Sequence, residues 1–202
     1  PTSLLLPQVV DAVEGSDVVL LGAGGFFDGR GLVAALAYGA DGIAMGTRFL
    51  LTAESTVPEQ VRSVYLDTPL QGTVVTSAID GAPQRVIRTA MIEALERAPG
   101  PLRFPRAARN ALRFARAAGL SVPELVRTGL AMRKDQQLTW SQVALAANAP
   151  MMTRAAMVEG DLGVGILPTG QVVGAISDLP KVSELLGRIA DEASAVLERL
   201  GR

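Results

Sequence analysis

The chain has 202 residues, of which 49% are hydrophobic, so it is long enough to fold as one sizeable domain with a substantial core. Its formal net charge of −1 argues against nucleic acid as a partner, and no run approaches the roughly 18 apolar residues of a membrane span. The lack of cysteine excludes disulfides, thiolate catalysis and cysteine-bound metals, and it fits a cytoplasmic protein. The lack of histidine means that proton transfer must use another side chain, a cofactor or a residue outside this chain.

The first part of the chain predicts alternating helices and strands. Apolar residues at helical spacing predict a helix over Ser3–Val13, and the run DVVLL predicts a strand over Asp17–Leu21 that is buried on both faces. A helix over Arg30–Tyr38, with Asp28 as its N-cap, and a second buried strand over Gly42–Met45 follow. This order of strand, helix and strand predicts a parallel β/α arrangement.

Downstream, the sequence predicts a hairpin and then a more helical region. Two alternating runs within Gly72–Thr89 flank the dipeptide DG at positions 80 and 81, which is typical of a hairpin turn. A helix over Met91–Arg97 precedes a stretch rich in proline that begins at Pro99. The clearest helix is the last one, over Val182–Leu200, because its apolar side chains form one face.

Each of the two predicted buried strands is followed by glycine. Gly24 and Gly25 follow the first strand, whereas Gly46 and Thr47 follow the second. Glycine lets backbone N–H groups approach a phosphate without a Cβ in the way, and the Thr47 hydroxyl is a further donor. A phosphate site in (β/α)8 barrels often lies in the loops after the last two strands, so two successive glycine turns predict a phosphate cup.

Two other interpretations of these glycines stay open from the residues alone. The stretch GAG at positions 22–24 begins a dinucleotide-binding fingerprint, but Phe27 stands at its third glycine position. Asp41 also precedes the second strand, whereas the ribose-binding acid of that fingerprint should follow it. The same glycines also suit ordinary tight turns between strands and helices, with no ligand.

The stretch GAGGFFDGRGLVAALAYGADGIAMGTRFLLTAES, at positions 22–55, resembles the nitronate monooxygenase (2-nitropropane dioxygenase-like) family. The segments TSLLLPQVVDAV, DGAPQRVIRT, QLTWSQVALAANAP and GQVVGAISDLP also resemble the actinobacterial branch of this family that acts in steroid ring degradation. The resemblance therefore covers nearly the whole chain. It implies an FMN-dependent TIM-barrel enzyme, and the branch implies an indene-carboxyl-CoA as the substrate.

The resemblance implies an α/β fold in which residues 1–98 are the C-terminal part of a (β/α)8 TIM barrel. Residues 99–202 are then a mostly helical region on the substrate side that packs back on the barrel. No catalytic residue is expected in this chain, because the catalytic histidine of many family members belongs to an upstream loop. The residues that the resemblance assigns to FMN are Ala23, Gly24, Gly25, Gly46, Thr47 and Gln171.

A cationic stripe stands out in the predicted helical region. Arg106, Arg109 and Arg113 recur at helical spacing, so they are expected on one face of a helix. If the substrate is an acyl-CoA, these arginines suit its phosphates, although a solvated helix face explains the same spacing. Arg48 is expected to form a structural ion pair and not to contact a substrate.

These observations together predict an FMN-dependent oxidoreductase that acts on a small molecule or an acyl-CoA, with NAD(P)H or oxygen as electron partner. One alternative is a non-catalytic barrel half that needs its upstream portion or a partner chain. Another is a flavin-free TIM-barrel enzyme that acts on a phosphorylated small molecule. An incomplete barrel has an unpaired parallel edge, so the isolated chain is expected to form homo-oligomers or to dissolve poorly.

Overall fold

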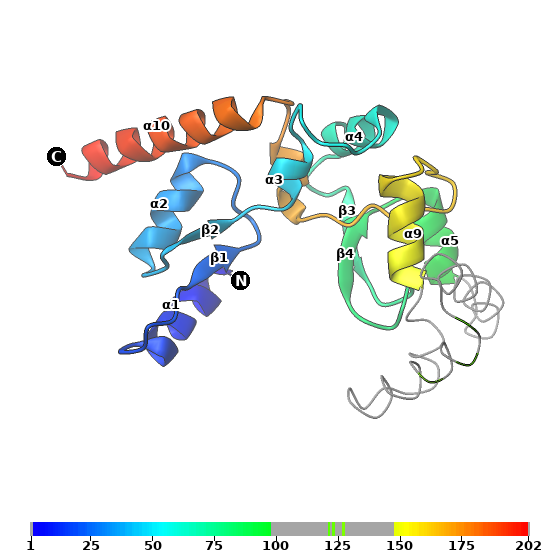
Figure 1. The fold of residues 1–202 in the computed structure, drawn as a ribbon, viewed down its shortest axis with the longest axis horizontal. Helices are drawn as coiled ribbons and strands as arrows, with labels where there is room; N and C mark the ends of the chain where they lie inside the picture. Colours follow the sequence, from blue (N-terminus) through cyan, green and yellow to red (C-terminus); the bar gives the residue numbers. More distant parts are fainter. Residues whose placement is uncertain (1, 98–120, 122, 124–126, 128–147, 202) are drawn as a thin grey trace. The chain divides into compact units, whose positions relative to one another are not determined.

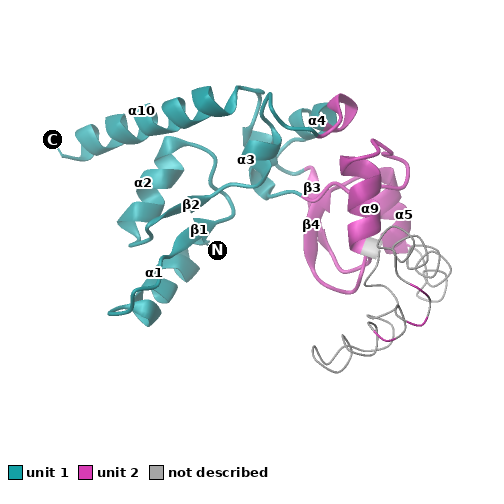
Figure 2. Cartoon of the chain, in the orientation of Figure 1, with its two compact units in different colours: residues 1–56, 62–71, 169–202 teal, residues 57–61, 72–168 magenta. Residues whose placement is uncertain are grey.

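The computed structural model describes residues 2–97, 121, 123, 127 and 148–201. The chain separates into two compact units, which Figure 2 shows in different colours: residues 1–56, 62–71 and 169–202 form the first, and residues 57–61 and 72–168 the second. The predicted boundary at residue 98 falls where the description stops, so that division of the chain stays a prediction. The predicted cationic stripe, Arg106, Arg109 and Arg113, lies outside the described residues.

The first unit begins with alternating helices and strands. Its first four elements are α1 (Thr2–Val13), β1 (Leu21–Ala23), α2 (Gly29–Ala37) and β2 (Gly42–Ala44). The strands are parallel, and their register pairs Leu21 with Gly42 and Ala23 with Ala44. Because α2 connects the two strands (Figure 1), the predicted parallel β/α arrangement is confirmed.

The first strand differs from the prediction in its position and its burial. It begins at Leu21, where the predicted strand Asp17–Leu21 ends, and Val18 and Val19 before it are 57% and 72% exposed. The expected burial on both faces is wrong, because Leu21 and Ala23 are exposed and only Gly22 between them is buried. Among the described residues, β2 is the single strand that pairs with β1. One edge of β1 therefore has no strand beside it in this part of the chain.

The remaining elements of the first unit come from the middle and the end of the chain. They are α3 (Thr47–Leu50), most of α4 (Glu59–Leu66), the 3-10 helix η2 (Gln171–Ala175) and α10 (Val182–Leu200). The long helix α10 lies alongside α2 (Figure 1) and buries Leu185 and Ile189, as its apolar face predicted. Contact between the two helices is close at Gly29, where a Cβ would meet the backbone N of Ala193 at 2.5 Å.

A small apolar core holds α1 and α2 against the strands of the first unit. Leu6 from α1 and Ala35 from α2 are fully or almost fully buried. Leu20, Phe26 and Ile43 pack against them from the strand side. Burial of such side chains contributes about 1.5–3 kcal/mol each for the larger residues, so this core fixes the strands from which the two glycine turns leave.

The second unit is built on an antiparallel hairpin. Its described strands are β3 (Thr73–Thr76) and β4 (Gln84–Ile87), and its described helices include α5 (Ala90–Arg97) and α9 (Asn148–Met157). The predicted hairpin is present, but Thr76 pairs with Gln84, so its loop is longer than a two-residue turn at Asp80 and Gly81. Within this loop the Asp80 carboxylate accepts the N–H of Ala82 at 3.0 Å, and Gly81 has a φ of 93°. Ile79, Val86 and Ile92 are fully buried at the core of this unit.

Each unit combines helices and strands, so the part of the chain that the structure describes is α/β. Of the described helices, none combines the length and the apolar composition that crossing a bilayer requires. Within residues 2–97 and 148–201, no three histidine, cysteine or acidic side chains gather as a metal site.

Candidate functional site

The first glycine turn follows directly from β1. Ala23 is the last residue of the strand, and Gly24 and Gly25 continue with φ values of 91° and 89°, which glycine adopts without strain. A Cβ at either glycine would meet none of the described atoms within 4 Å. Because all three residues are exposed as well, a ligand has access to the backbone of this turn.

Two carboxylates bind the start of the helix that follows the first turn. Asp28 is the N-cap of α2, as the sequence predicted, and its Oδ1 accepts the N–H of Gly31 at 2.8 Å. Glu192, on α10, accepts the N–H of Gly29 at 2.8 Å. These two amides of the helix N-terminus are therefore satisfied, and an anion at this turn must use the backbone around Gly24 and Gly25.

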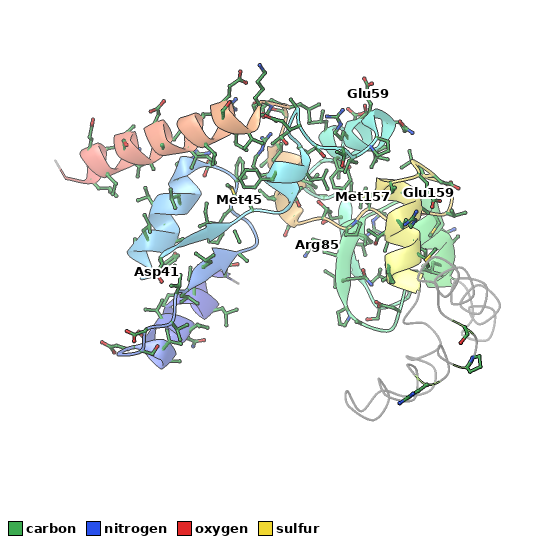
Figure 3. All side chains as sticks on the ribbon, viewed as in Figure 1. Asp41, Met45, Glu59, Arg85, Met157 and Glu159 are labelled. Atoms are coloured by element: carbon green, nitrogen blue, oxygen red, sulfur yellow. The ribbon has the colours of Figure 1, made fainter. Side chains whose placement is uncertain are left out.

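The second glycine turn leaves the same edge of the sheet as the first. Figure 3 shows Asp41 just before β2 and Met45 just after it, and β2 is parallel to β1. Since Ala23 and Ala44 pair at the ends of the two strands, both strands end at one edge. Gly46 comes next, and a Cβ there would also meet none of the described atoms within 4 Å.

Thr47, which follows Gly46, is joined to a segment far along the chain. Its Oγ1 accepts the N–H of Gly170 at 3.0 Å and lies 3.5 Å from Oγ1 of Thr169. A distance of 3.5 Å is long for a hydrogen bond between two hydroxyls, and either oxygen can be its donor. Gln171 is the residue after Gly170; it begins η2 and is exposed. The fold therefore brings the start of the Gln171 helix to Thr47.

Arg48 is buried and makes the ion pair that the sequence predicted. The residue is 3% exposed, and its Nη1 donates to Oδ1 of Asp178 at 2.8 Å. Its Nη2 donates to the backbone oxygens of Leu51 and Asp178, at 2.6 and 2.9 Å. Arg188, on α10, donates to the other carboxylate oxygen of Asp178 at 2.6 Å. The structural role expected for Arg48 is confirmed.

The two arginines change the acidity of Asp178. Partial burial raises the pKa of this carboxyl group, but the hydrogen bonds and charges of Arg188 and Arg48 outweigh burial and leave the pKa below its ordinary value. Asp178 is therefore ionised over a wider range of acidic pH than a free aspartate.

The predicted ligand residues can bind an oxyanion but do not transfer protons. They offer backbone N–H groups, the hydroxyl of Thr47 and the carboxamide of Gln171, all of which can donate hydrogen bonds to phosphate oxygens. None of these groups titrates near neutral pH. That no catalytic residue belongs to this chain stays a prediction.

Three residues that hold the two turns are not predicted from the sequence: Gly170, Asp178 and Glu192. Their partners lie 123, 130 and 163 residues away along the chain. No local spacing marks contacts of this length. The quoted segment GQVVGAISDLP begins at Gly170 and contains Asp178, but it did not indicate a partner for that aspartate, and no motif marks Glu192.

Comparison with known proteins assigns the chain to a family. A family model described as nitronate monooxygenase matches residues 1–192. The chain belongs to the nitronate monooxygenase family. Over 98% of its length it is 50% identical to the (3aS,4S,5R,7aS)-5-hydroxy-7a-methyl-1-oxo-octahydro-1H-indene-4-carboxyl-CoA dehydrogenase of Mycobacterium tuberculosis, and 48% identical over 99% to the protein of the same name from Rhodococcus jostii. Each match covers 56% of the relative, so the chain spans about half the length of these curated relatives.

Solved structures resemble the chain over the same extent. FabK from Thermotoga maritima matches 98% of this chain and 50% of its own, with a TM-score of 0.64 and 28% identity. The nitroalkane oxidase of Streptomyces ansochromogenes matches 98% of this chain and 45% of its own, with a TM-score of 0.62. Its identity of 24% supports a shared fold alone. The resemblance to the family and to its steroid branch, which the sequence motifs indicated, is thus confirmed.

Proposed function

We propose that the chain forms the phosphate-binding part of an FMN-dependent oxidoreductase, with its first unit as the C-terminal part of a (β/α)8 barrel. One observation carries the proposal: two glycine turns leave neighbouring parallel strands at the same edge of the sheet. Membership of the nitronate monooxygenase family supports a flavin, since flavin dependence is general in that family. The choice of FMN rests on the open space at Gly24, Gly25 and Gly46, which gives a phosphate access to their backbone N–H groups.

The residues present suit a phosphate group. Space is open beside Gly24, Gly25 and Gly46, where any other residue would place a Cβ. Because carboxylates already bind the N–H groups of Gly29 and Gly31, the nearby N-terminus of α2 does not compete with the turns for the anion.

Each predicted ligand would have a separate task at this site. The backbone N–H groups of Gly24, Gly25 and Gly46 would hold the phosphate, with Thr47 donating its hydroxyl proton and Gln171 its carboxamide. Ala23 would bring the end of β1 to the group. When bound, the flavin supplies electron transfer, and these residues bind and orient it. The proton transfers of the reaction belong to residues other than these.

An acyl-CoA with a fused-ring acyl group is the substrate that we propose. The relatives at 48–50% identity are named as dehydrogenases of an indene-carboxyl-CoA. Arg106, Arg109 and Arg113 are proposed ligands of the CoA phosphates, because guanidinium groups bind phosphate oxygens in pairs. NAD(P)H or oxygen is the proposed electron partner.

A second proposal concerns what else the site needs. The chain spans 56% of its relatives, and β1 has a free edge among the described residues. Leu21 in β1 and Val18 and Val19 just before it are 53%, 57% and 72% exposed. Apolar strand edges of this kind associate readily with other chains or segments. The flavin is then bound only when further barrel strands, from the same polypeptide or from a partner chain, cover this edge.

The visible absorption spectrum of the purified chain tests the proposed function. After incubation with FMN and dialysis, we expect structured flavin bands to remain with the protein and to be lost in Gly25→Val, which strains the backbone of the first turn. Gly187→Ala is the control, because Gly187 lies in α10 and a Cβ there has no described neighbour within 4 Å.

The same spectrum distinguishes the two proposals. Retention by the 202-residue chain alone shows that the two turns suffice. Retention only after the chain is extended upstream to the length of its relatives supports the need for further barrel strands. If neither protein retains flavin, the proposed function is wrong.

A further inference from the structure

Hydrogen bonds join the residues that follow β2 to the segment between η2 and the start of α10. Ala53 donates its N–H to the backbone oxygen of Pro180 at 2.9 Å. The carboxylate of Glu54 accepts the N–H of Val182, the first residue of α10, at 3.0 Å. Together with the bond to Thr47 at the other end, these contacts join the two segments along their whole length.

Arg48 and Asp178 form the charged contact between these ends. Arg48 directly follows Thr47, and its guanidinium binds both the carboxylate and the backbone oxygen of Asp178. It also binds the backbone oxygen of Leu51, just beyond α3. Its buried Nε has no hydrogen-bond partner among the described atoms, so all of its hydrogen bonds are made by the two Nη atoms. One guanidinium thus ties the start and the end of α3 to Asp178.

Arg188 orients the carboxylate that Arg48 binds. Its Nη1 lies 2.6 Å from Oδ2 of Asp178, which leaves Oδ1 for Arg48. The side chains of Arg188 and Asp178 are 47% and 39% exposed, whereas that of Arg48 is 3% exposed. Of these three side chains, only that of Arg48 is buried. The Asp178 carboxylate, which accepts hydrogen bonds from both arginines, therefore fixes the position of the Arg48 guanidinium.

We propose that Asp178 is a positioning residue of the phosphate site: through Arg48 it fixes the turn that carries Gly46 and Thr47. The inference rests on the proposed function and deepens it. Asp178 does not touch the phosphate; it sets the position of the donors that do. Loss of Asp178 therefore weakens recognition of the phosphate and leaves recognition of the flavin ring nearly unchanged.

Binding of FMN and of riboflavin separates these two contributions, because the two flavins differ by the phosphate. We measure Kd for each by titration of flavin fluorescence. The wild-type chain, extended upstream if it needs further strands, binds FMN more tightly. Asp178→Asn weakens FMN binding about tenfold, the loss of roughly one charged hydrogen bond, and changes riboflavin binding less than about twofold. Arg188→Gln weakens FMN binding about threefold.

The control for the loss of a carboxylate is Glu93→Gln. Glu93 pairs with Arg97 on the surface of α5 in the second unit, at 2.8 Å, and takes no part in either glycine turn. This variant leaves both dissociation constants unchanged. Circular dichroism reports whether each variant is folded. If Asp178→Asn does not fold, Arg188→Gln, at a half-exposed residue, tests the positioning role instead. The measured quantity is again the ratio of the Kd for FMN to the Kd for riboflavin.

The outcomes distinguish the failure of this inference from that of the proposed function. If the wild-type protein binds neither flavin, or both equally, the proposed phosphate site is wrong and the role of Asp178 is wrong with it. If the wild-type protein prefers FMN and Asp178→Asn keeps that preference, only the role of Asp178 is overturned. Equal weakening of both flavins in Asp178→Asn shows a general structural role and also overturns the positioning role.

Discussion

The two glycine turns leave the same sheet edge but are held in different ways. In the first turn, Gly24 and Gly25 adopt φ values of 91° and 89°, so the chain path depends on the conformations of these residues themselves. In the second turn, Gly46 has an ordinary φ of −83°, and Thr47 and Arg48 are bound to a segment more than 120 residues away.

The conformation of the first turn is thus determined by nearby residues, and that of the second turn by residues far along the chain. The conformation of the first turn depends mainly on its own residues, because glycine permits it. Its distant contact, from Glu192, is made to Gly29 at the start of the helix that follows. The second turn reaches its final form only when the segment around Gly170 and Asp178 has docked. Substitutions should therefore act on the first turn through backbone strain and on the second through lost partners.

Removal of the Asp178 side chain should have the largest effect. In Asp178→Ala, the almost fully buried guanidinium of Arg48 loses its carboxylate, and we expect the free energy of unfolding to fall by about 2–3 kcal/mol. Urea denaturation followed by circular dichroism measures the change. Glu93→Ala, which breaks an exposed pair on α5, should lower stability by less than about 0.5 kcal/mol. Similar losses in both variants would contradict the long-range specification of the second turn.

A glycine-to-alanine substitution in the first turn should have the next largest effect on stability. Comparison with the same substitution in the second turn tests most directly whether the two turns differ in backbone strain. Gly25→Ala places a Cβ on a residue with a φ of 89°, and we expect a loss of about 1–2 kcal/mol. Gly46→Ala, at a φ of −83° with open space around it, should change stability by less than about 0.5 kcal/mol. Equal effects in urea denaturation would show that backbone conformation does not distinguish the turns.

Replacement of the Thr47 hydroxyl should have a smaller effect. Thr47→Val keeps the shape of the side chain but leaves the N–H of Gly170 without its acceptor, and we expect a loss of about 1 kcal/mol. Thr47→Ser retains the hydroxyl and should lose much less. The thermal midpoints of the two variants provide the comparison, and a Thr47→Ser protein as unstable as Thr47→Val would rule out this role of the hydroxyl.

The smallest effect is a dependence on pH. Because the folded-state pKa of Asp178 lies below its ordinary value of 3.8, its stabilising contribution is present above that value and is lost as the pH falls through the lower, folded-state pKa. The stability difference between wild type and Asp178→Asn should be constant near neutral pH and shrink below about pH 4. Urea denaturation at several pH values measures it, and a difference that persists in strong acid would exclude the contribution of this carboxylate.

Features specified by neighbouring residues were predictable from the sequence. The cap at Asp28 depends on a group three residues away and occurs as expected. The hairpin around Asp80 also occurs, although its loop is longer than a two-residue turn. The glycines at 24 and 25 were also identified as turn residues, because each follows an apolar run directly. The family resemblance also implied a role for Gln171 in flavin binding, which stays a prediction; the structure shows the preceding residue, Gly170, bound to Thr47.

Features specified by distant partners were not predictable. The exposure of Val18 and Val19 depends on which strands lie beside β1, and an apolar run does not reveal its neighbours. Asp178 and Glu192 look like ordinary acidic residues, although each binds a group at one of the glycine turns. Their roles follow from chain topology, which local periodicity does not encode.

The discontinuity of the first unit has a consequence for synthesis on the ribosome. Residues 72–168, which belong to the second unit, are translated before residues 169–202 of the first unit, a delay of roughly 5–20 s at typical elongation rates of about 5–20 residues per second. During that delay, the nascent chain carries Arg48 without Asp178 and α2 without the cover of α10. The first unit is therefore begun before the second and completed after it, and in this interval it is most open to chaperones and proteases.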